Sequence, residues 1–191
     1  MKTGIFFSCL ISIIILTGCS ATRRTSKPGT RQAETTVSKG IESTVVIRKK
    51  VPERAIDTRN VSAFDVIEFA KTLIGVKYKY GSTDKAKGFD CSGFVTYVFN
   101  HFNISVPRVS VDFTNAGINI PIEYSKPGDI ILFTGSDAKS GVVGHMGIII
   151  ENDNGDVKFI HASESRGVMI SGMNSYFVPR FIKVNRIFTV F

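Results

Sequence analysis

Cys91 is the residue of this 191-residue chain whose surroundings favour covalent chemistry. It stands in GFDCSGFV, residues 88–95, between an aspartate and a serine and directly before an apolar run with helical spacing. The first turn of a helix favours an anion, because its backbone amides are unpaired and the helix dipole is positive there, and this predicts a lowered thiol pKa. The same amides could stabilise an oxyanion. Cys91 is therefore either a nucleophile or a small buried apolar residue.

A thiol nucleophile needs a base, and histidine suits that task near neutral pH. His145 begins one predicted strand and His161 ends the next, with a turn at NDNGD, residues 152–156. Paired positions of an antiparallel hairpin have a constant sum, so a turn centred near residue 153 brings the two imidazoles together, with the register uncertain by about two residues. One ring can then act on the thiol while the other orients it.

The third histidine, His101, stands at the predicted end of a helix and is expected to be a surface or capping residue. Zinc is an alternative for the main cluster, since Cys91, His145 and His161 are all zinc-ligand types. Closely spaced CxxC or HxxxH pairs are missing, however, so neither a metal nor another cofactor is expected.

Two helices and a sheet are predicted to position these residues. The first helix follows a Ser62 cap, with Asp65 at its third position, and ends at Gly75. The second begins at Cys91. A loop and a short helix capped by Ser110 follow. The apolar residues with helical spacing in the first helix are Phe64, Ile67, Phe69, Ala70, Leu73 and Ile74. In the second helix the apolar residues form an expected core face of Phe94, Val95, Val98, Phe99 and Phe102.

Beyond Pro127-Gly128 the pattern changes to short runs rich in Ile, Val and Phe between turn residues. These predicted strands are DIILF, VGHMGIIIE, DVKFIHA, GVMI and RFIKVNRIF. Helices first and a mostly antiparallel sheet afterwards predict an α+β domain, with the helix that carries Cys91 packed on the sheet.

The first 19 residues predict an exported, lipid-anchored protein. The apolar segment at residues 5–16 is too short to cross the roughly 30 Å bilayer core. It ends in Leu-Thr-Gly-Cys, which has the form of a bacterial lipobox, so cleavage before Cys19 and lipidation of that residue are expected. The alternative is a soluble secreted protein. Residues 1–18 are thus a signal peptide, 19–60 hold the lipidated cysteine and a flexible basic tether, and 61–191 form the domain.

Most of the net charge of +8 lies in the tether. Residues 20–60 hold 10 Lys or Arg and 4 Asp or Glu, against 13 and 12 in residues 61–191. The tether is expected either to contact anionic lipids or wall polymers or to act as a solvated spacer, with one weakly supported strand at residues 43–51. Nucleic acid is excluded as a partner, because the chain is exported and its folded region shows no interleaving of basic and aromatic residues.

Cys91 is the only thiol expected in the folded part, since Cys9 leaves with the signal peptide and Cys19 carries lipid. No internal disulfide is then possible. A lone thiol in an oxidising compartment favours a catalytic reason for its presence over packing alone.

Four stretches, GFDCSGFV, KPGDIILF, GHMGIII and FIHAS, resemble in order and separation the NlpC-type cell-wall cysteine peptidases. The resemblance covers residues 63–191. It implies a small papain-like α+β fold in which Cys91 is the nucleophile, His145 the base and His161 the third, orienting residue.

The resemblance also implies roles for residues near the nucleophile. A tyrosine near the thiol in this family corresponds to Tyr78 or Tyr80, and Tyr78 is preferred although Ser82 replaces a usual glycine. Strand packing is the alternative for both tyrosines. Asp90 and Ser92 are candidates for binding the free amine of a substrate peptide, or for capping the helix.

Two departures from the family pattern stand out. Phe113 replaces a usual glutamine and is expected to alter the floor of the substrate groove. Residues 134–144 form a long, glycine-containing lead into His145, which predicts a mobile rim that selects among substrates.

The expected function is that of a peptidoglycan endopeptidase that cuts stem peptides or cross-links at γ-D-Glu–diaminopimelate or D-Ala–diaminopimelate bonds. The alternatives are an amidase or acyltransferase on the same framework and a non-catalytic wall-binding lipoprotein. Peptidoglycan is the expected substrate and partner. The chain is expected to be a monomer held on the periplasmic side of a membrane by Cys19, and Ser20 favours the outer membrane because it is not the aspartate linked to inner-membrane retention.

Overall fold

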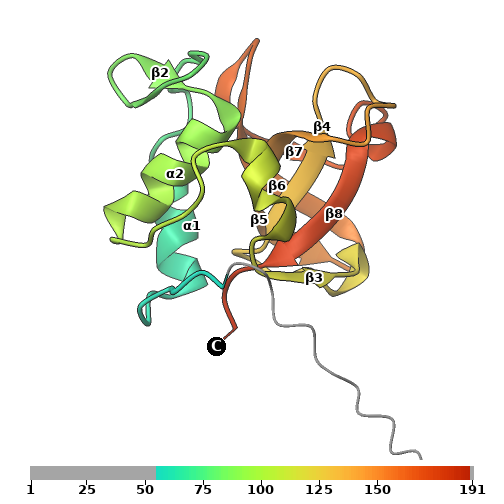
Figure 1. The fold of residues 1–191 in the computed structure, drawn as a ribbon, viewed down its shortest axis with the longest axis horizontal. Helices are drawn as coiled ribbons and strands as arrows, with labels where there is room; N and C mark the ends of the chain where they lie inside the picture. Colours follow the sequence, from blue (N-terminus) through green and yellow to red (C-terminus); the bar gives the residue numbers. More distant parts are fainter. Residues whose placement is uncertain (1–54, 190–191) are drawn as a thin grey trace, which may run out of the picture. The chain divides into compact units, whose positions relative to one another are not determined.

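The structure is a computed structural model that describes residues 55–189, and its two helices pack on one face of an antiparallel sheet (Figure 1). The elements before the main sheet are α1 (Ala63–Lys71), the small strand pair β1 (Thr83–Asp84) and β2 (Gly88–Phe89), α2 (Cys91–His101) and the 3-10 helix η1 (Ser110–Asn115). The six strands of the sheet are β3 (Ile118–Ile120), β4 (Ile130–Thr134), β5 (Val143–Asp153), β6 (Asp156–Ser163), β7 (Gly167–Gly172) and β8 (Phe181–Arg186), with η2 (Ile122–Tyr124) after β3 and η3 (Val178–Arg180) before β8. They lie in the order β3-β8-β4-β5-β6-β7.

The predicted α+β class is confirmed, and all five predicted strands are present. The predicted signal peptide, Cys19, the tether up to residue 54 and the weak strand at residues 43–51 lie outside the described residues. Among the residues that are described, no helix is long and apolar enough to span a bilayer.

Helix α1 begins at the predicted cap, since Ser62 Oγ accepts a hydrogen bond of 3.1 Å from the Asp65 amide. The helix ends at Lys71, and a series of turns leads on to Gly75. Two of the apolar residues with helical spacing are not buried: Phe64 and Ile74 are 69% and 50% exposed. The buried stripe of α1 is narrow and contains Val66, so side chains at its margins remain in solvent.

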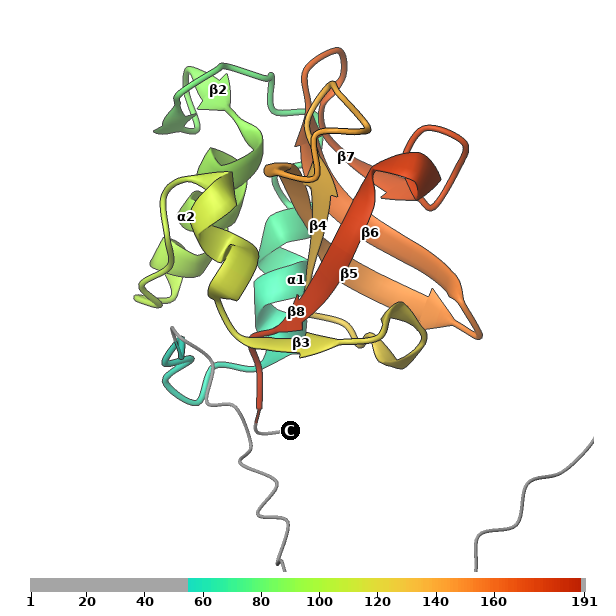
Figure 2. The same ribbon diagram turned by 45° about the vertical axis from the view of Figure 1, so that its right-hand side comes forward.

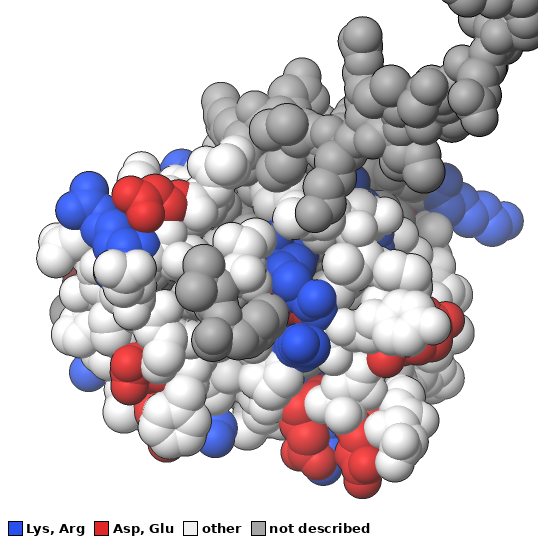
Figure 3. All heavy atoms as spheres, turned by 90° about the horizontal axis from the view of Figure 1, so that it is seen from below, with Lys and Arg blue, Asp and Glu red and all other residues white. Residues whose placement is uncertain are grey.

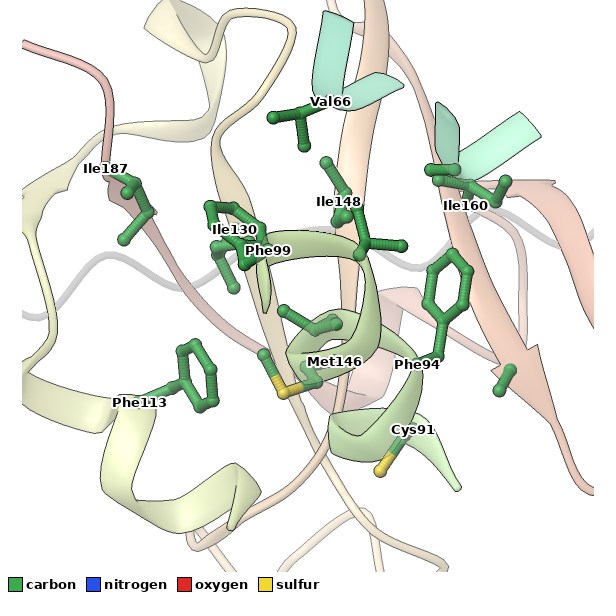
Figure 4. Close-up of a cluster of buried hydrophobic side chains, with 14 of the residues drawn as sticks. Val66, Cys91, Phe94, Phe99, Phe113, Ile130, Met146, Ile148, Ile160 and Ile187 are labelled. Atoms are coloured by element: carbon green, nitrogen blue, oxygen red, sulfur yellow. The ribbon is translucent and has the colours of Figure 1, made fainter. Parts of the chain in front are cut away.

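Helix α2 begins at Cys91, and Figure 2 shows it on the same side of the sheet as α1. Most of its expected apolar face is confirmed, because Phe94, Val95, Val98 and Phe99 are fully buried, whereas Phe102 is only partly covered. Figure 4 shows this cluster, with Phe94 and Phe99 facing Met146 and Ile148 of β5 and Cys91 at one border. A second apolar cluster covers the opposite face of the sheet, and it contains Ile131, Phe133, Ile149, Val157, Phe159, Phe177 and Val184.

The hairpin of β5 and β6 turns at Asn154-Gly155, which have φ values of 49° and 99°. Two successive positive φ angles fit the tight turn that Asn-Gly favours. Ile148 pairs with Ile160, and a register shift follows between Ile149 and Glu151. On the histidine side of this shift the pairing differs by two residues from the predicted one, which keeps the histidine side chains on the predicted face.

A buried ion pair joins the start of β4 to the end of β8. Arg186 donates to both oxygens of Asp129, at 3.1 and 2.9 Å, and the Lys126 amide donates to the same carboxylate at 2.7 Å. Asp129 is 1% exposed, so the Asp of KPGD has a structural role. Elsewhere charges of both signs are interspersed, as on the face in Figure 3, in keeping with the nearly balanced charge of residues 61–191.

Helix η1 is not capped by a serine as predicted. Its N-cap is Val109, and no side chain accepts a hydrogen bond from its first amides. The C-terminal end of η1 is held by hydrogen bonds instead, because Nδ2 of Asn185 in β8 donates to the carbonyls of Phe113 and Thr114, at 2.8 and 3.3 Å. The sequence could not indicate this contact, since it joins residues about 70 positions apart.

Candidate active site

Cys91 is the first residue of α2 and is 8% exposed. It borders a cavity of about 990 Å³, which is also lined by all the other predicted site residues of the described chain: Tyr78, Tyr80, Asp90, Ser92, His145 and His161. Its Sγ atom lies 3.8 Å from the carbonyl oxygen of Gly144, the residue before His145. The start of α2 and the start of β5 are therefore in contact, although they are more than 50 residues apart.

The predicted lowering of the thiol pKa is wrong. Burial and, to a smaller extent, the Asp90 carboxylate raise the pKa of Cys91, which is about 11. The amides of Ser92 and Cys91 and the charge of Arg108 lower the pKa, but they do not offset burial. Near neutral pH the resting group is therefore a thiol.

The two histidines lie together, as the hairpin predicted. Nε2 of His145 is 3.0 Å from Nδ1 of His161, and the ring planes are nearly perpendicular, at 89°. Burial lowers the pKa of His145 to about 4, and burial together with repulsion from His145 lowers the pKa of His161 to about 3. Both imidazoles are thus neutral near pH 7, and Nδ1 is the nitrogen of His145 that does not face His161.

Two residues that sequence reasoning missed help to position this pair. Ser171 of β7 places its hydroxyl 2.9 Å from Nε2 of His161. Gly147 leaves room for the side chains of Phe159 and His161, because a Cβ at residue 147 would lie 2.8 Å from Cδ2 of Phe159 and 3.2 Å from Cβ of His161. A glycine two residues after a histidine in a buried strand was a visible signal for such a close approach.

Asp90 caps α2, since its Oδ1 accepts from the Gly93 amide. Arg108, which sequence reasoning also missed, donates to Oδ1 and Oδ2 of Asp90 at 3.1 and 2.8 Å and to Oγ of Ser92 at 3.0 Å. The capping alternative for Asp90 is therefore confirmed. Ser92 does not cap the helix; it hydrogen bonds to Asp90 and Arg108.

The two tyrosines differ in their surroundings. Tyr78 forms an isolated parallel bridge with Phe89, and burial raises the pKa of its phenol to about 12, so the group is a neutral donor. Tyr80 is 84% exposed at the edge of the cavity, so strand packing does not account for it.

Three further expectations concern the surroundings of the site. His101 is exposed at the end of α2, where its ring stacks on Phe69 at 3.7 Å, in line with a surface role. Phe113 is 1% exposed in the core, so the expectation that it alters the groove floor is wrong. Within residues 55–189 no group of three or more His, Cys, Asp or Glu side chains is arranged to hold a metal ion.

The segment at residues 134–144 borders the cavity through its ends, at Thr134, Gly135, Ser136 and Gly144. Gly135 and Gly144 lie against each other, since a Cβ on Gly144 would be 2.7 Å from the Gly135 amide nitrogen. The predicted position at the rim is confirmed. Its mobility and its selectivity stay predictions.

A cysteine at a helix start that shares a cavity with two paired histidines on an antiparallel sheet is the architecture of a papain-like cysteine peptidase. The chain belongs to the NlpC/P60 family, which residues 75–186 match.

Two characterised relatives are each similar to more than half of this chain. Murein DD-endopeptidase MepS/murein LD-carboxypeptidase of Escherichia coli (strain K12) is 37% identical over 116 residues, 59% of this chain and 56% of that protein. Gamma-DL-glutamyl hydrolase of Bacillus subtilis (strain 168) is 35% identical over 124 residues, 64% of this chain and 29% of that protein. This chain thus spans little more than half of one relative and less than a third of the other.

Solved structures agree with the fold. A crystal structure of an NlpC/P60 family protein from Bacillus cereus has a TM-score of 0.60 and 28% identity, and it covers 69% of this chain and 42% of that one. The NlpC/P60 domain of the peptidoglycan hydrolase SagA has a TM-score of 0.54 and 29% identity, and it covers 66% of this chain and 99% of that domain.

Proposed function

We propose that this protein is a peptidoglycan endopeptidase that cleaves amide bonds in stem peptides or their cross-links. The observation that carries the proposal is the cavity that Cys91 lines together with the paired imidazoles of His145 and His161. Relatives named as murein endopeptidase and gamma-DL-glutamyl hydrolase support the substrate class.

In the proposed first step, Sγ of Cys91 attacks the carbonyl carbon while its proton passes to Nδ1 of His145. Because the thiol pKa is raised and the imidazole pKa is lowered, proton transfer accompanies attack and does not precede it. The oxyanion that forms is stabilised by the Cys91 amide at the positive end of α2 and by the phenol of Tyr78. His161 accepts a hydrogen bond from Nε2 of His145 and so stabilises the imidazolium.

The second half of the reaction returns the site to its resting state. His145 gives its proton to the leaving amine as the C–N bond breaks, which leaves a thioester on Cys91. Water then attacks the thioester carbonyl and transfers a proton to His145. The carboxylic acid departs as the C–S bond breaks, and the proton returns to the sulfur.

Asp90 and Ser92 are proposed to bind a substrate amine beside the nucleophile. Oδ1 of Asp90 already accepts from Gly93, Ser92 and Arg108, whereas among the described residues Oδ2 accepts from Arg108 alone. An ammonium group would therefore bind Oδ2. Tyr80, at the exposed edge of the cavity, is proposed to contact the same substrate.

The proposal for the rest of the chain rests on its sequence. Residues 1–18 act as a signal peptide, Cys19 is lipidated, and the basic segment up to residue 60 tethers a monomeric domain to the periplasmic side of the outer membrane. Replacing Cys19 by serine should move the protein from the membrane fraction to the soluble periplasm. An unchanged distribution would refute the anchor.

The hydrolase is tested by digestion of purified sacculi and of defined muropeptides, with products identified by mass. Cleavage of the γ-D-Glu–diaminopimelate bond should release a peptide that begins with diaminopimelate, whereas cleavage of the D-Ala–diaminopimelate cross-link should separate two stems and free the second amine of diaminopimelate. Cys91→Ala should abolish cleavage, and His101→Ala, in the exposed histidine, should not. Release of lactyl-linked peptide indicates an amidase, and wall binding without any product indicates a non-catalytic protein.

A further inference from the structure

Tyr176 is an exposed aromatic residue that is nevertheless held in place. Tyr176 is 53% exposed, and the guanidinium carbon of Arg180 lies 4.0 Å from the centroid of its ring. Arg180 also donates from Nη1 to the Tyr176 carbonyl at 2.9 Å, and the ring of Phe177 packs edge-on at 5.1 Å. The backbone is fixed as well, because Oδ1 of Asn174 accepts from the amides of Tyr176 and Phe177, at 2.9 and 3.2 Å.

The ring stands at the rim of the candidate active site. Tyr176 lines the cavity, and the adjacent Phe177 packs against the rings of His145 and His161, with centroids 6.2 and 5.4 Å apart. Arg180 reaches the neighbouring rim too, since Nη2 donates to the Ser136 carbonyl at 3.2 Å. One guanidinium therefore joins the ring to the loop before β5.

Other exposed tyrosines lack this support. Tyr80 also lines the cavity, and Tyr124 is 70% exposed elsewhere, but within residues 55–189 neither ring has a stacking or cation–π partner. A side chain that is already ordered loses little conformational entropy when a ligand covers it. Tyr176 is thus a preorganised binding surface.

We propose that Tyr176 stacks against a sugar ring of the glycan strand, so that the enzyme acts on stem peptides still attached to sugar. This rests on the proposed function. Alanine, glutamate and diaminopimelate carry no large apolar group, whereas one face of a pyranose ring presents C–H groups to the negative face of an aromatic ring. The hydroxyls at the sugar edge would meet the short polar side chains that line the same cavity, Ser136, Ser165 and Asn174.

The test compares one cross-linked peptide with and without its disaccharide. The wild-type enzyme should have the higher kcat/KM on the disaccharide-linked form. Tyr176→Ala should lower the ratio of the two kcat/KM values by about ten-fold, the order expected for one lost stacking contact, whereas Tyr176→Phe should keep it. Tyr124→Ala is the matched control for loss of an exposed tyrosine, and it should keep the ratio.

A ratio that Tyr176→Ala leaves unchanged would overturn the proposal. Failure of the wild-type enzyme to cleave either form would instead refute the endopeptidase function. In that case a binding experiment tests the sugar contact independently of cleavage. The disaccharide of N-acetylglucosamine and N-acetylmuramic acid, titrated by calorimetry, should bind to the Cys91→Ala variant. Adding the Tyr176→Ala change to that variant should weaken the binding. Equal binding by both variants, with melting confirming that each is folded, would refute it.

Discussion

Nε2 of His145 lies 3.0 Å from Nδ1 of His161, so one proton is shared between them. His161 has a second partner, since its Nε2 lies 2.9 Å from the Ser171 hydroxyl. If each Nε2 carries the proton, both hydrogen bonds run in one direction, and the lone pair on Nδ1 of His145 remains available for the thiol proton. In this arrangement His145 has the tautomer that a base requires.

Removal of this last hydrogen bond should slow the reaction. In Ser171→Ala, the His161 N–H loses its acceptor, so we expect kcat to fall about five- to ten-fold, as for one net hydrogen bond of about 1 kcal/mol. Ser171→Thr keeps the hydroxyl and should recover most of the rate. An alanine variant with wild-type kcat would show that Ser171 does not position the pair.

The acid limit of activity should lie unusually low. The neutral form of His145 is the base, and its pKa is lowered to about 4, so kcat/KM should stay nearly constant from pH 7 to about 5 and fall as the pH passes through about 4. In a resting thiolate–imidazolium pair, a low thiol pKa would set the acid limit of activity, and a histidine pKa above its usual range would set the alkaline limit. A pH profile of kcat/KM on a soluble muropeptide distinguishes them.

Stability must be followed at each pH. The native state keeps both imidazoles neutral, whereas the unfolded chain binds protons at its histidines below about pH 6.5. Unfolding is therefore increasingly favoured as the pH falls from about 6.5 towards 4. Thermal melts over this range identify the points at which lost activity reflects chemistry in a folded protein.

Arg108 should contribute to both stability and thiol reactivity. Arg108→Met leaves the nearly buried Asp90 carboxylate without its bidentate partner, and because the arginine side chain is 39% exposed we expect a loss of about 1–3 kcal/mol. The same change should raise the pKa of Cys91, because the Arg108 charge lowers it. Urea unfolding and the pH dependence of thiol alkylation measure the two effects.

An exposed ion pair provides the control for this variant. The side chains of Lys158 and Glu151 are each nearly half exposed, and Nζ of Lys158 lies 3.1 Å from the Glu151 carboxylate. Because exposed ion pairs contribute little, Lys158→Met should leave the free energy of unfolding almost unchanged. If Arg108→Met also left the free energy of unfolding unchanged, the stabilising role of Arg108 would be refuted, because water would then be sufficient to solvate Asp90.

Gly147 should not tolerate a side chain. A Cβ at this position would lie 2.8 Å from Cδ2 of Phe159 and 2.9 Å from the Ile160 carbonyl, so Gly147→Ala should cost about 1–3 kcal/mol and shift the His161 ring. At Gly172 the nearest atom would be the Val157 carbonyl, 3.7 Å away, so Gly172→Ala is the control. Equal melting temperatures of the two variants would contradict the argument.

Local patterns were sufficient to predict the elements that carry the chemistry. The Ser62 cap, the apolar face that follows Cys91 and the alternation of apolar residues around His145 and His161 depend on neighbours within a few positions. The short, exposed strand β3 has no such pattern and was missed. The family motifs added the pairing of Cys91 with the two histidines, which spacing alone does not establish.

Contacts across the fold could not be predicted in the same way. Arg108 is 18 positions from Asp90, and Ser171 reaches His161 from the next strand. The net direction of the Cys91 pKa was also beyond the sequence, because the position at a helix start is local whereas burial depends on every element around the sulfur.

Cys91 belongs to a helix and its histidines to a sheet, and apolar side chains such as Phe94 and Met146 fill the space between these layers. No covalent link or metal bridge joins the helix to the sheet among the described residues. The packing of these apolar side chains therefore sets the position of the sulfur relative to the histidines. We expect changes that loosen the packing between helix and sheet to lower activity before they unfold the domain.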